Sequence, residues 1–181
     1  MPHRRAGPDA SLPASPSVQE RFAPASVCFG CGPANVQGLH VRSFPDSARP
    51  GGLVATWMPR PHHHAFAHVL NGGIIGVVLD CHANWTAALA MMRASGADRP
   101  PATVTADYEV RLLAPTPTDA PLTIRAWPVE VSHRRATSEG RLEAPDGTVT
   151  ATFRGRFVAV RENHPAHDRW QPGGGPSGEA S

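Results

Sequence analysis

The chain contains no lysine, although 17 of its 181 residues are basic, so every one of them is arginine. The planar guanidinium group suits phosphate recognition, but codon usage in a GC-rich genome explains the same enrichment and is favoured here. The arginines are scattered along the chain and do not form the basic patch that nucleic-acid binding requires. With a formal net charge of only +2, the sequence argues against a nucleic-acid-binding domain.

Long uninterrupted hydrophobic runs are also missing. The first twenty residues include Arg4 and Arg5 but not the apolar core of a signal peptide. The most apolar stretch, Val69–Met92, is interrupted by polar side chains, and charges inside a membrane are costly. These side chains are Asn71, Asp80, His82, Asn84 and Thr86. We therefore expect neither a leader nor a membrane span, and the chain is predicted to be cytoplasmic.

Cysteine is scarce, with three residues in the whole chain. An odd number without a dense disulfide pattern indicates a reducing compartment. Cys28 and Cys31 form a Cys-x-x-Cys pair, and the histidines 62–64 and 68 follow it. A structural zinc needs four ligands and a second such pair is missing, so a capped turn is favoured, and neither a metal nor a cofactor is predicted. A thioredoxin-like role needs the pair before a helix in a βαβ unit, which is also missing.

The length fits one domain with two tails. Residues 1–20 are rich in proline, serine and alanine without periodicity, and residues 164–181 are rich in glycine and proline. Both segments are predicted to be disordered. Residues 21–163 form the predicted domain.

Within this domain, short strands are expected at Leu39–Phe44 and Leu53–Met58, separated by a turn rich in proline and glycine. Residues Asn71–Met92 contain no proline and predict a helix of about six turns. This helix is apolar nearly all round, and a helix without a polar face must be enclosed by other structure.

After Pro100 and Pro101 the hydrophobic period changes to two, which predicts half-buried antiparallel strands. The first has an apolar face made of Val104, Ala106, Tyr108, Val110 and Leu112. The next, over residues 122–131, changes phase at Pro128, which predicts a bulge or an edge. Residues 136–143 and 149–160 predict a hairpin with its turn at 144–147. Together the elements favour an α+β fold with a curved antiparallel sheet of about six strands around one central helix.

The residues that point to chemistry are Asn71, Gly72, Gly73 and Asp80. Glycines at a helix start let another group approach the backbone, and the unpaired N–H groups there suit an oxyanion. Asp80 lies about 12 Å further along the helix axis and within roughly 80° of Gly72. One chain cannot easily bring both to one carbonyl group, whereas a site shared by two chains can. The structural alternative is tight packing at the glycines and a hydrogen-bonded buried carboxylate at Asp80.

Asn71-Gly72-Gly73 followed by Asp80 resembles a motif of the hotdog-fold thioesterase superfamily, in its PaaI-like, phenylacetate-pathway branch. That motif is a His-Gly-Gly loop opening the central helix, with an acidic residue nine positions after the histidine. The segment from Cys28 to Leu39 is similar to the Cys-x-x-Cys-Gly opening of one subgroup. The resemblance spans about residues 26–160, and asparagine in place of histidine at position 71 leaves the role of that position open.

The resemblance implies an acyl-CoA thioesterase that acts as a homodimer or homotetramer with active sites between protomers. Asp80 is the implied general base or nucleophile, and the Gly72 amide, with that of Gly73, is the implied oxyanion hole. Asn71 is expected to hydrogen-bond the carbonyl group or to orient water. Asn84, one turn after Asp80, is the implied polar helper. The acyl group is not specified.

His82 and Arg135 are candidate substrate-binding residues. For His82 the alternative is a hydrogen-bonded histidine of the core or of an interface, and for Arg135 it is a solvated strand end. Cys81 and His82 point about 100° apart on the helix and cannot form a nucleophile–base pair. A second function on the same fold is a non-catalytic acyl-CoA binding or sensing module. The carboxylate at position 80 favours the enzyme, because a pure binder gains nothing from it.

Overall fold

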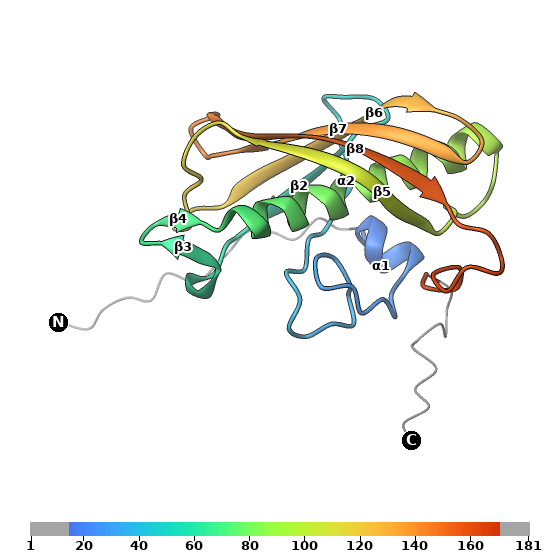
Figure 1. The fold of residues 1–181 in the computed structure, drawn as a ribbon, viewed down its shortest axis with the longest axis horizontal. Helices are drawn as coiled ribbons and strands as arrows, with labels where there is room; N and C mark the ends of the chain where they lie inside the picture. Colours follow the sequence, from blue (N-terminus) through green and yellow to red (C-terminus); the bar gives the residue numbers. More distant parts are fainter. Residues whose placement is uncertain (1–14, 171–181) are drawn as a thin grey trace, which may run out of the picture.

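The structure is a computed structural model that describes residues 15–170 (Figure 1). Its main sheet has six strands, all antiparallel, in the spatial order β1-β2-β6-β7-β8-β5. In that order the strands are Phe44–Pro45, Leu53–Trp57, Leu122–Val131, Arg135–Glu143, Val149–Ala159 and Thr103–Leu112. A short sheet of β3 (His64–Phe66) and β4 (Val69–Leu70), preceded by the 3₁₀ helix η1 (Pro61–His63), lies at one end.

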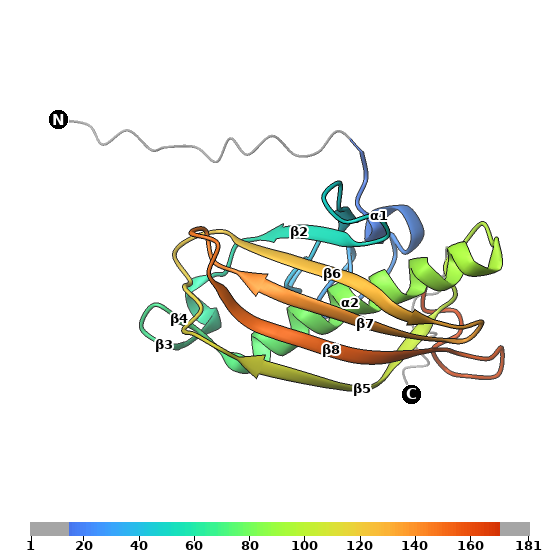
Figure 2. The same cartoon turned by 90° about the horizontal axis from the view of Figure 1, so that it is seen from above.

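The central helix α2 (Gly72–Ser95) runs along the inner face of this curved sheet (Figures 1 and 2). On the other side of α2 lie the short helix α1 (Val18–Phe22) and the loop that follows it. The predicted α+β architecture, with a sheet wrapped around one helix, is therefore confirmed. By length and composition α2 would be able to cross a membrane, but 78% of its most apolar window is buried inside the protein. This enclosure explains why the helix needs no polar face.

A chain of hydrogen bonds through the core ties the layers together. Gln19 of α1 donates to Ser43 Oγ over 2.9 Å, and Ser43 Oγ lies 2.8 Å from Nδ1 of His82 on α2. His82 Nε2 donates to the Leu53 carbonyl of β2 over 3.0 Å. Burial lowers the pKa of His82 to about 4, so the imidazole is neutral near pH 7. The buried side-chain polar atoms of Gln19, Ser43 and His82 thus all have partners, as the low dielectric of a core requires.

The strand predicted at Leu39–Phe44 is wrong in its bounds. Strand β1 consists of Phe44 and Pro45, which pair with β2, and Phe44 is the one residue that the prediction and the strand share. The N–H groups of Leu39 and Val41 instead donate to carbonyl groups of the loop before them, at Phe29 and Gly30. The alternating pattern at this position therefore reflects the burial of Leu39 and Val41 and not pairing with a neighbouring strand.

The packed unit is also longer than the predicted domain. Ser17 caps α1, and Val18 is buried, although both fall in the predicted N-terminal tail. At the other end, Trp170 is 5% exposed and stacks on Trp85 of α2 with 4.1 Å between ring centroids. Burial of Val18 and Trp170 in the common core holds both ends of the described segment against the fold. The rest of the predicted tails, residues 1–14 and 171–181, lies outside the described part.

The other strand predictions hold, with one correction in β5. The phase change at Pro128 is a register shift against β7, and Gly147 closes the predicted hairpin turn with φ of 85°. In β5 a further shift between Thr105 and Asp107 reverses the alternation. As a result Thr105 faces α2, while the apolar face continues from Tyr108. β5 is also a sheet edge, so Tyr108 and Leu112 are 51% and 58% exposed and not half-buried as predicted.

Replacement of His82 by leucine is expected to lower the free energy of unfolding by about 2–4 kcal/mol, because Ser43 and the Leu53 carbonyl lose their buried partner. Urea denaturation measures this change. His133→Leu, at an exposed position, is the control and is expected to stay within about 0.5 kcal/mol of the wild type. Equal stabilities of the two variants would contradict the role of His82 as the link between layers.

Candidate active site

Three of the predicted site residues of α2, Gly72, Asp80 and Asn84, lie with Gly76 on one stripe of the helix that faces strand β5. A side-chain carbon built at Gly72 would lie 3.3 Å from Leu112, and one built at Gly76 would lie 3.5 Å from the Tyr108 hydroxyl. Further along, Asp80 and Asn84 hydrogen-bond β5. Residues four apart on a helix share a face, and the two elements run antiparallel, so the pairs follow each other in order. We call this line of contacts, between Gly72, Gly76, Asp80 and Asn84 of α2 and the edge strand β5, the α2–β5 seam.

Asp80 is half-buried in this seam and accepts a hydrogen bond from the Thr105 hydroxyl on Oδ1, over 2.8 Å. Burial raises the pKa of its carboxyl group, the Thr105 hydrogen bond opposes that shift, and the nearby Cys28 adds to it. The second carboxylate oxygen has no hydrogen-bond partner within residues 15–170. Sequence reasoning missed Thr105, because the bulge that turns it towards α2 hides its direction in the alternation.

Asn84 lies one turn beyond Asp80, as predicted, but it faces away from solvent. Its side chain is 5% exposed and accepts a short hydrogen bond from the hydroxyl of Thr103, which is fully buried. The Asp80–Thr105 and Asn84–Thr103 pairs repeat the same helix-to-strand contact at successive turns. Asn84 therefore holds β5 against α2 and lies beside the candidate site rather than in its open part.

The start of α2 is exposed and only partly capped. Asn71 is the N-cap, and its Oδ1 accepts the Gly73 N–H over 2.8 Å. The Gly73 amide is therefore engaged, and its predicted use as an oxyanion donor is wrong. The Gly72 N–H has no partner in the described part of the chain. Because the cap uses the Asn71 oxygen, its Nδ2 amino group is left as a second available donor.

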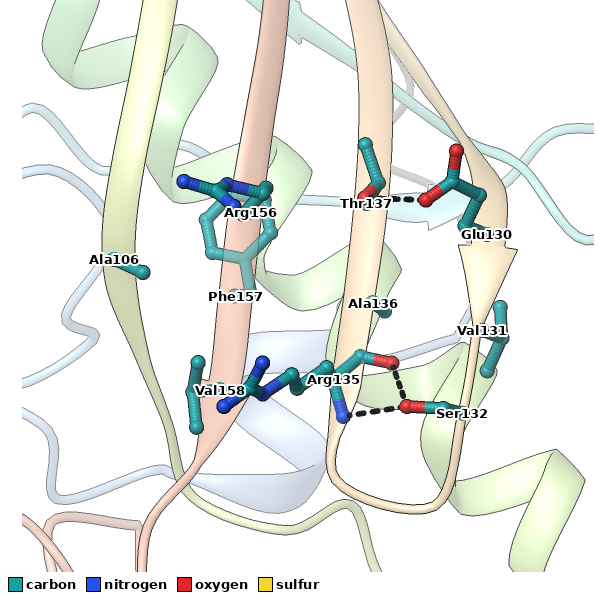
Figure 3. Close-up of a pocket in the computed structure, with 10 residues that line it drawn as sticks. All are labelled: Ala106, Glu130, Val131, Ser132, Arg135, Ala136, Thr137, Arg156, Phe157 and Val158. Carbon is teal, nitrogen blue, oxygen red and sulfur yellow. Dashed lines mark hydrogen bonds between the residues drawn. The ribbon is translucent and has the colours of Figure 1, made fainter.

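The two predicted substrate-binding residues do not lie in the seam. His82 has no exposed surface and uses both ring nitrogens in the core, so its assignment to substrate contact is wrong and the core alternative holds. Arg135 lies at the start of β7 in a hollow on the outer face of the sheet (Figure 3). Its side chain extends across β8 towards Val158. In this chain the sheet separates Arg135 from Asp80.

Metal-ligating side chains meet at one place in residues 15–170, where Cys28 and Cys31 lie beside Cys81. Cys81 directly follows Asp80 in α2. The histidines of residues 62–64 are not part of this cluster, and His63 instead stacks on Trp57 with 5.5 Å between ring centroids.

Solved structures with the same fold are known. A crystal structure of a thioesterase superfamily protein from Shewanella loihica is 28% identical over 71% of this chain and 97% of its own, with a TM-score of 0.56. Another thioesterase superfamily protein is 24% identical over 72% of this chain, which spans 62% of that protein, with a TM-score of 0.60. PaaI of the E. coli phenylacetic acid degradation operon is 15% identical over 68% of this chain and 81% of its own, with a TM-score of 0.57.

No curated protein matches the chain significantly. The family model of the thioesterase superfamily matches residues 67–151, which include α2, the strands β5 to β7 and the first residues of β8. The matched segment therefore contains the whole α2–β5 seam. By its sheet wrapped around one helix the chain has the hotdog fold, and its residues 67–151 are similar to the thioesterase superfamily.

Proposed function

We propose that the protein is a cytoplasmic acyl-CoA thioesterase that hydrolyses its substrate to free CoA and a carboxylic acid. The observation that carries this proposal is the state of Asp80, a half-buried carboxylate with one free oxygen in a seam at the sheet edge. A buried carboxylate costs several kcal/mol of folding free energy when it is not fully paired. Such a cost is typical of residues kept for chemistry.

The surroundings of Asp80 suit proton transfer or nucleophilic attack. The Thr105 hydrogen bond fixes one oxygen and leaves the other to meet substrate. As a general base, Asp80 takes a proton from water while the water oxygen attacks the thioester carbon. As a nucleophile, it attacks that carbon itself and the acyl-enzyme is then hydrolysed. In either route the C–S bond breaks and the CoA thiolate takes up a proton.

The developing oxyanion needs donors aimed at it, and the start of α2 offers two. The Gly72 N–H has no partner in the described residues, and the Asn71 Nδ2 group lies beside it. The positive end of the helix dipole supports the same charge. This assignment replaces the Gly73 amide with the Asn71 side chain, which takes the place of the histidine found in the related motif.

A homodimer completes this site, since Gly72 and Asp80 of one α2 are about 12 Å apart along the helix axis. β5, which lines the seam, is a sheet edge with free pairing groups. This edge has exposed apolar side chains at Tyr108 and Leu112 of β5 and at Leu113 directly after it. Antiparallel pairing of two β5 edges covers these side chains and brings the helix start of one protomer towards Asp80 of the other. A tetramer is the alternative assembly.

Asp80→Asn is expected to lower turnover of a responsive acyl-CoA by about 10²–10⁴-fold, the range for loss of a positioned acid–base group. A panel of short, medium, long and aryl acyl-CoA substrates, with CoA release followed by chromatography, measures the change. Asp107→Asn is the matched control, since Asp107 is an exposed carboxylate of β5 that pairs with Arg156. It is expected to retain wild-type turnover.

The same panel distinguishes the thioesterase from the second candidate function, a non-catalytic acyl-CoA binding module. Asn71 in place of histidine is the feature that favours it. Tight acyl-CoA binding without turnover by the wild-type protein would support the binding module and refute the enzyme.

Gly72→Pro is expected to reduce kcat by about 10²-fold, because proline removes the free N–H, and loss of one oxyanion donor costs about that much. Proline is tolerated at the first position of a helix. Asn71 already has the extended backbone that precedes proline, with φ of −63° and ψ of 132°. Gly72→Ala keeps the N–H and serves as the control. Equal kcat values for the two variants would remove the Gly72 amide from the mechanism.

A further inference from the structure

Three cysteines from distant parts of the chain meet beneath the seam. Cys28 and Cys31 lie in the loop after α1, and Cys81 lies on α2, 53 residues after Cys28. Their sulfur atoms all lie within 4.8 Å of one another, and those of Cys28 and Cys81 are 3.8 Å apart. In a tetrahedral zinc–thiolate site with Zn–S bonds of about 2.3 Å, the sulfur atoms are about 3.8 Å apart. The spacing of the cluster therefore suits a shared cation.

The loop is shaped around these sulfur atoms. A side chain at Gly30 would collide with Cys81 Sγ, and one at Gly32 would collide with the backbone at Ser26 and Cys28. Only glycine fits at both positions, so the chain wraps closely around the cluster.

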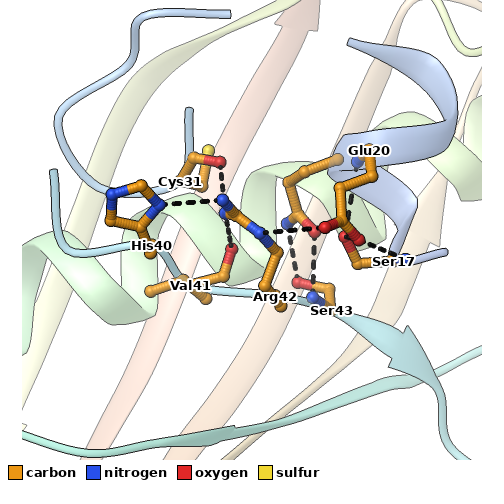
Figure 4. A network of polar contacts seen from close by, with 8 residues as sticks. Ser17, Glu20, Cys31, His40, Val41, Arg42 and Ser43 are labelled. Carbon is orange, nitrogen blue, oxygen red and sulfur yellow. Dashed lines mark hydrogen bonds and ion pairs between the residues drawn. The ribbon is translucent and has the colours of Figure 1, made fainter. Parts of the chain in front are cut away.

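Further donors point at Cys31. The Trp85 indole N–H donates to Cys31 Sγ over 3.4 Å, and Arg42 Nη1 donates to the Cys31 carbonyl over 3.0 Å (Figure 4). Arg42 also donates to the Val41 carbonyl and lies 2.9 Å from Nδ1 of His40. These contacts hold residues 40–42 beside the loop that carries Cys31. Trp85 thus donates to the sulfur of Cys31 while Arg42 holds its backbone, and hydrogen-bond partners of this kind orient metal ligands.

We propose that Cys28, Cys31 and Cys81 form a three-thiolate site for a thiophilic, tetrahedral cation of the Zn²⁺ class. The fourth position belongs to water or an external thiolate, since no other ligand joins the cluster within residues 15–170. Binding forms three metal–sulfur bonds and releases the remaining thiol protons to solvent. The sequence argued against a metal because it showed one cysteine pair, and the fold supplies the third ligand from α2.

The site has a structural consequence, because it joins the N-terminal loop to the central helix. A metal bound only by the folded chain stabilises it by mass action. The inference does not rest on the proposed thioesterase activity, because Asp80 is not one of the three ligands.

The test uses the full chain purified under reducing conditions. Elemental analysis is expected to find about one zinc ion per chain, and reconstitution with Co²⁺ is expected to give thiolate-to-cobalt charge-transfer absorption. Cys28→Ser changes the most accessible of the three cysteines and is expected to lose both signals. A chelator is expected to lower the melting temperature of the wild type and not that of Cys28→Ser.

Asp80→Asn is the matched control, since it changes the residue next to Cys81 without removing a sulfur. It is expected to keep the metal and the cobalt absorption even though it loses turnover, so the two proposals fail independently. Wild-type protein that binds neither zinc nor cobalt when its three thiols are reduced would overturn the site. Retention of metal and absorption by Cys28→Ser would overturn it as well.

Discussion

Enclosure of α2 is the constraint on which the rest of the structure depends. A helix of 24 residues that is apolar nearly all round is stable in water only when other elements cover every side of it. The sheet covers one side, and α1 with the following loop covers the other. Every polar group on this helix must then have a partner, which explains the links from His82 to Ser43 and from Asn84 to Thr103.

Asp80 is an exception, because only one of its two carboxylate oxygens has a hydrogen-bond partner in the described residues. The Thr105 hydroxyl binds this first oxygen, and the second oxygen has no hydrogen-bond partner within residues 15–170. The α2–β5 seam has glycines at positions 72 and 76, where the β5 side chains of Leu112 and Tyr108 pack closely on the helix, and it ends at the Gly72 amide, which has no partner in the described residues. The incompletely paired groups of Asp80 and Gly72 thus lie on the same side of α2, which the edge strand borders. The three cysteines lie close to this seam, since Cys81 directly follows Asp80, and the loop after α1 packs around them.

The sequence predicts those elements whose signal is local. The long apolar helix, the bulge at Pro128 and the hairpin closed at Gly147 follow from period and turn chemistry. The tail residues Val18 and Trp170 were missed because their burial depends on distant contacts with the core. Thr105 was missed because a bulge reverses the alternation, and the Gly73 amide was misassigned because the Asn71 cap competes for it. The cluster of Cys28 with Cys81 was missed because the two residues are 53 positions apart in the sequence and meet only in the folded chain.

The shared site is the central claim, and mixed oligomers test it most directly. Asp80→Asn and Gly72→Pro each disable a different half of the site. If one protomer supplies the helix start and the other supplies the carboxylate, half of randomly mixed dimers are hybrids, and each hybrid has one intact site. Co-refolding equal amounts of the two variants is then predicted to restore about 25% of wild-type turnover. Turnover no higher than that of the separate variants would contradict the shared site.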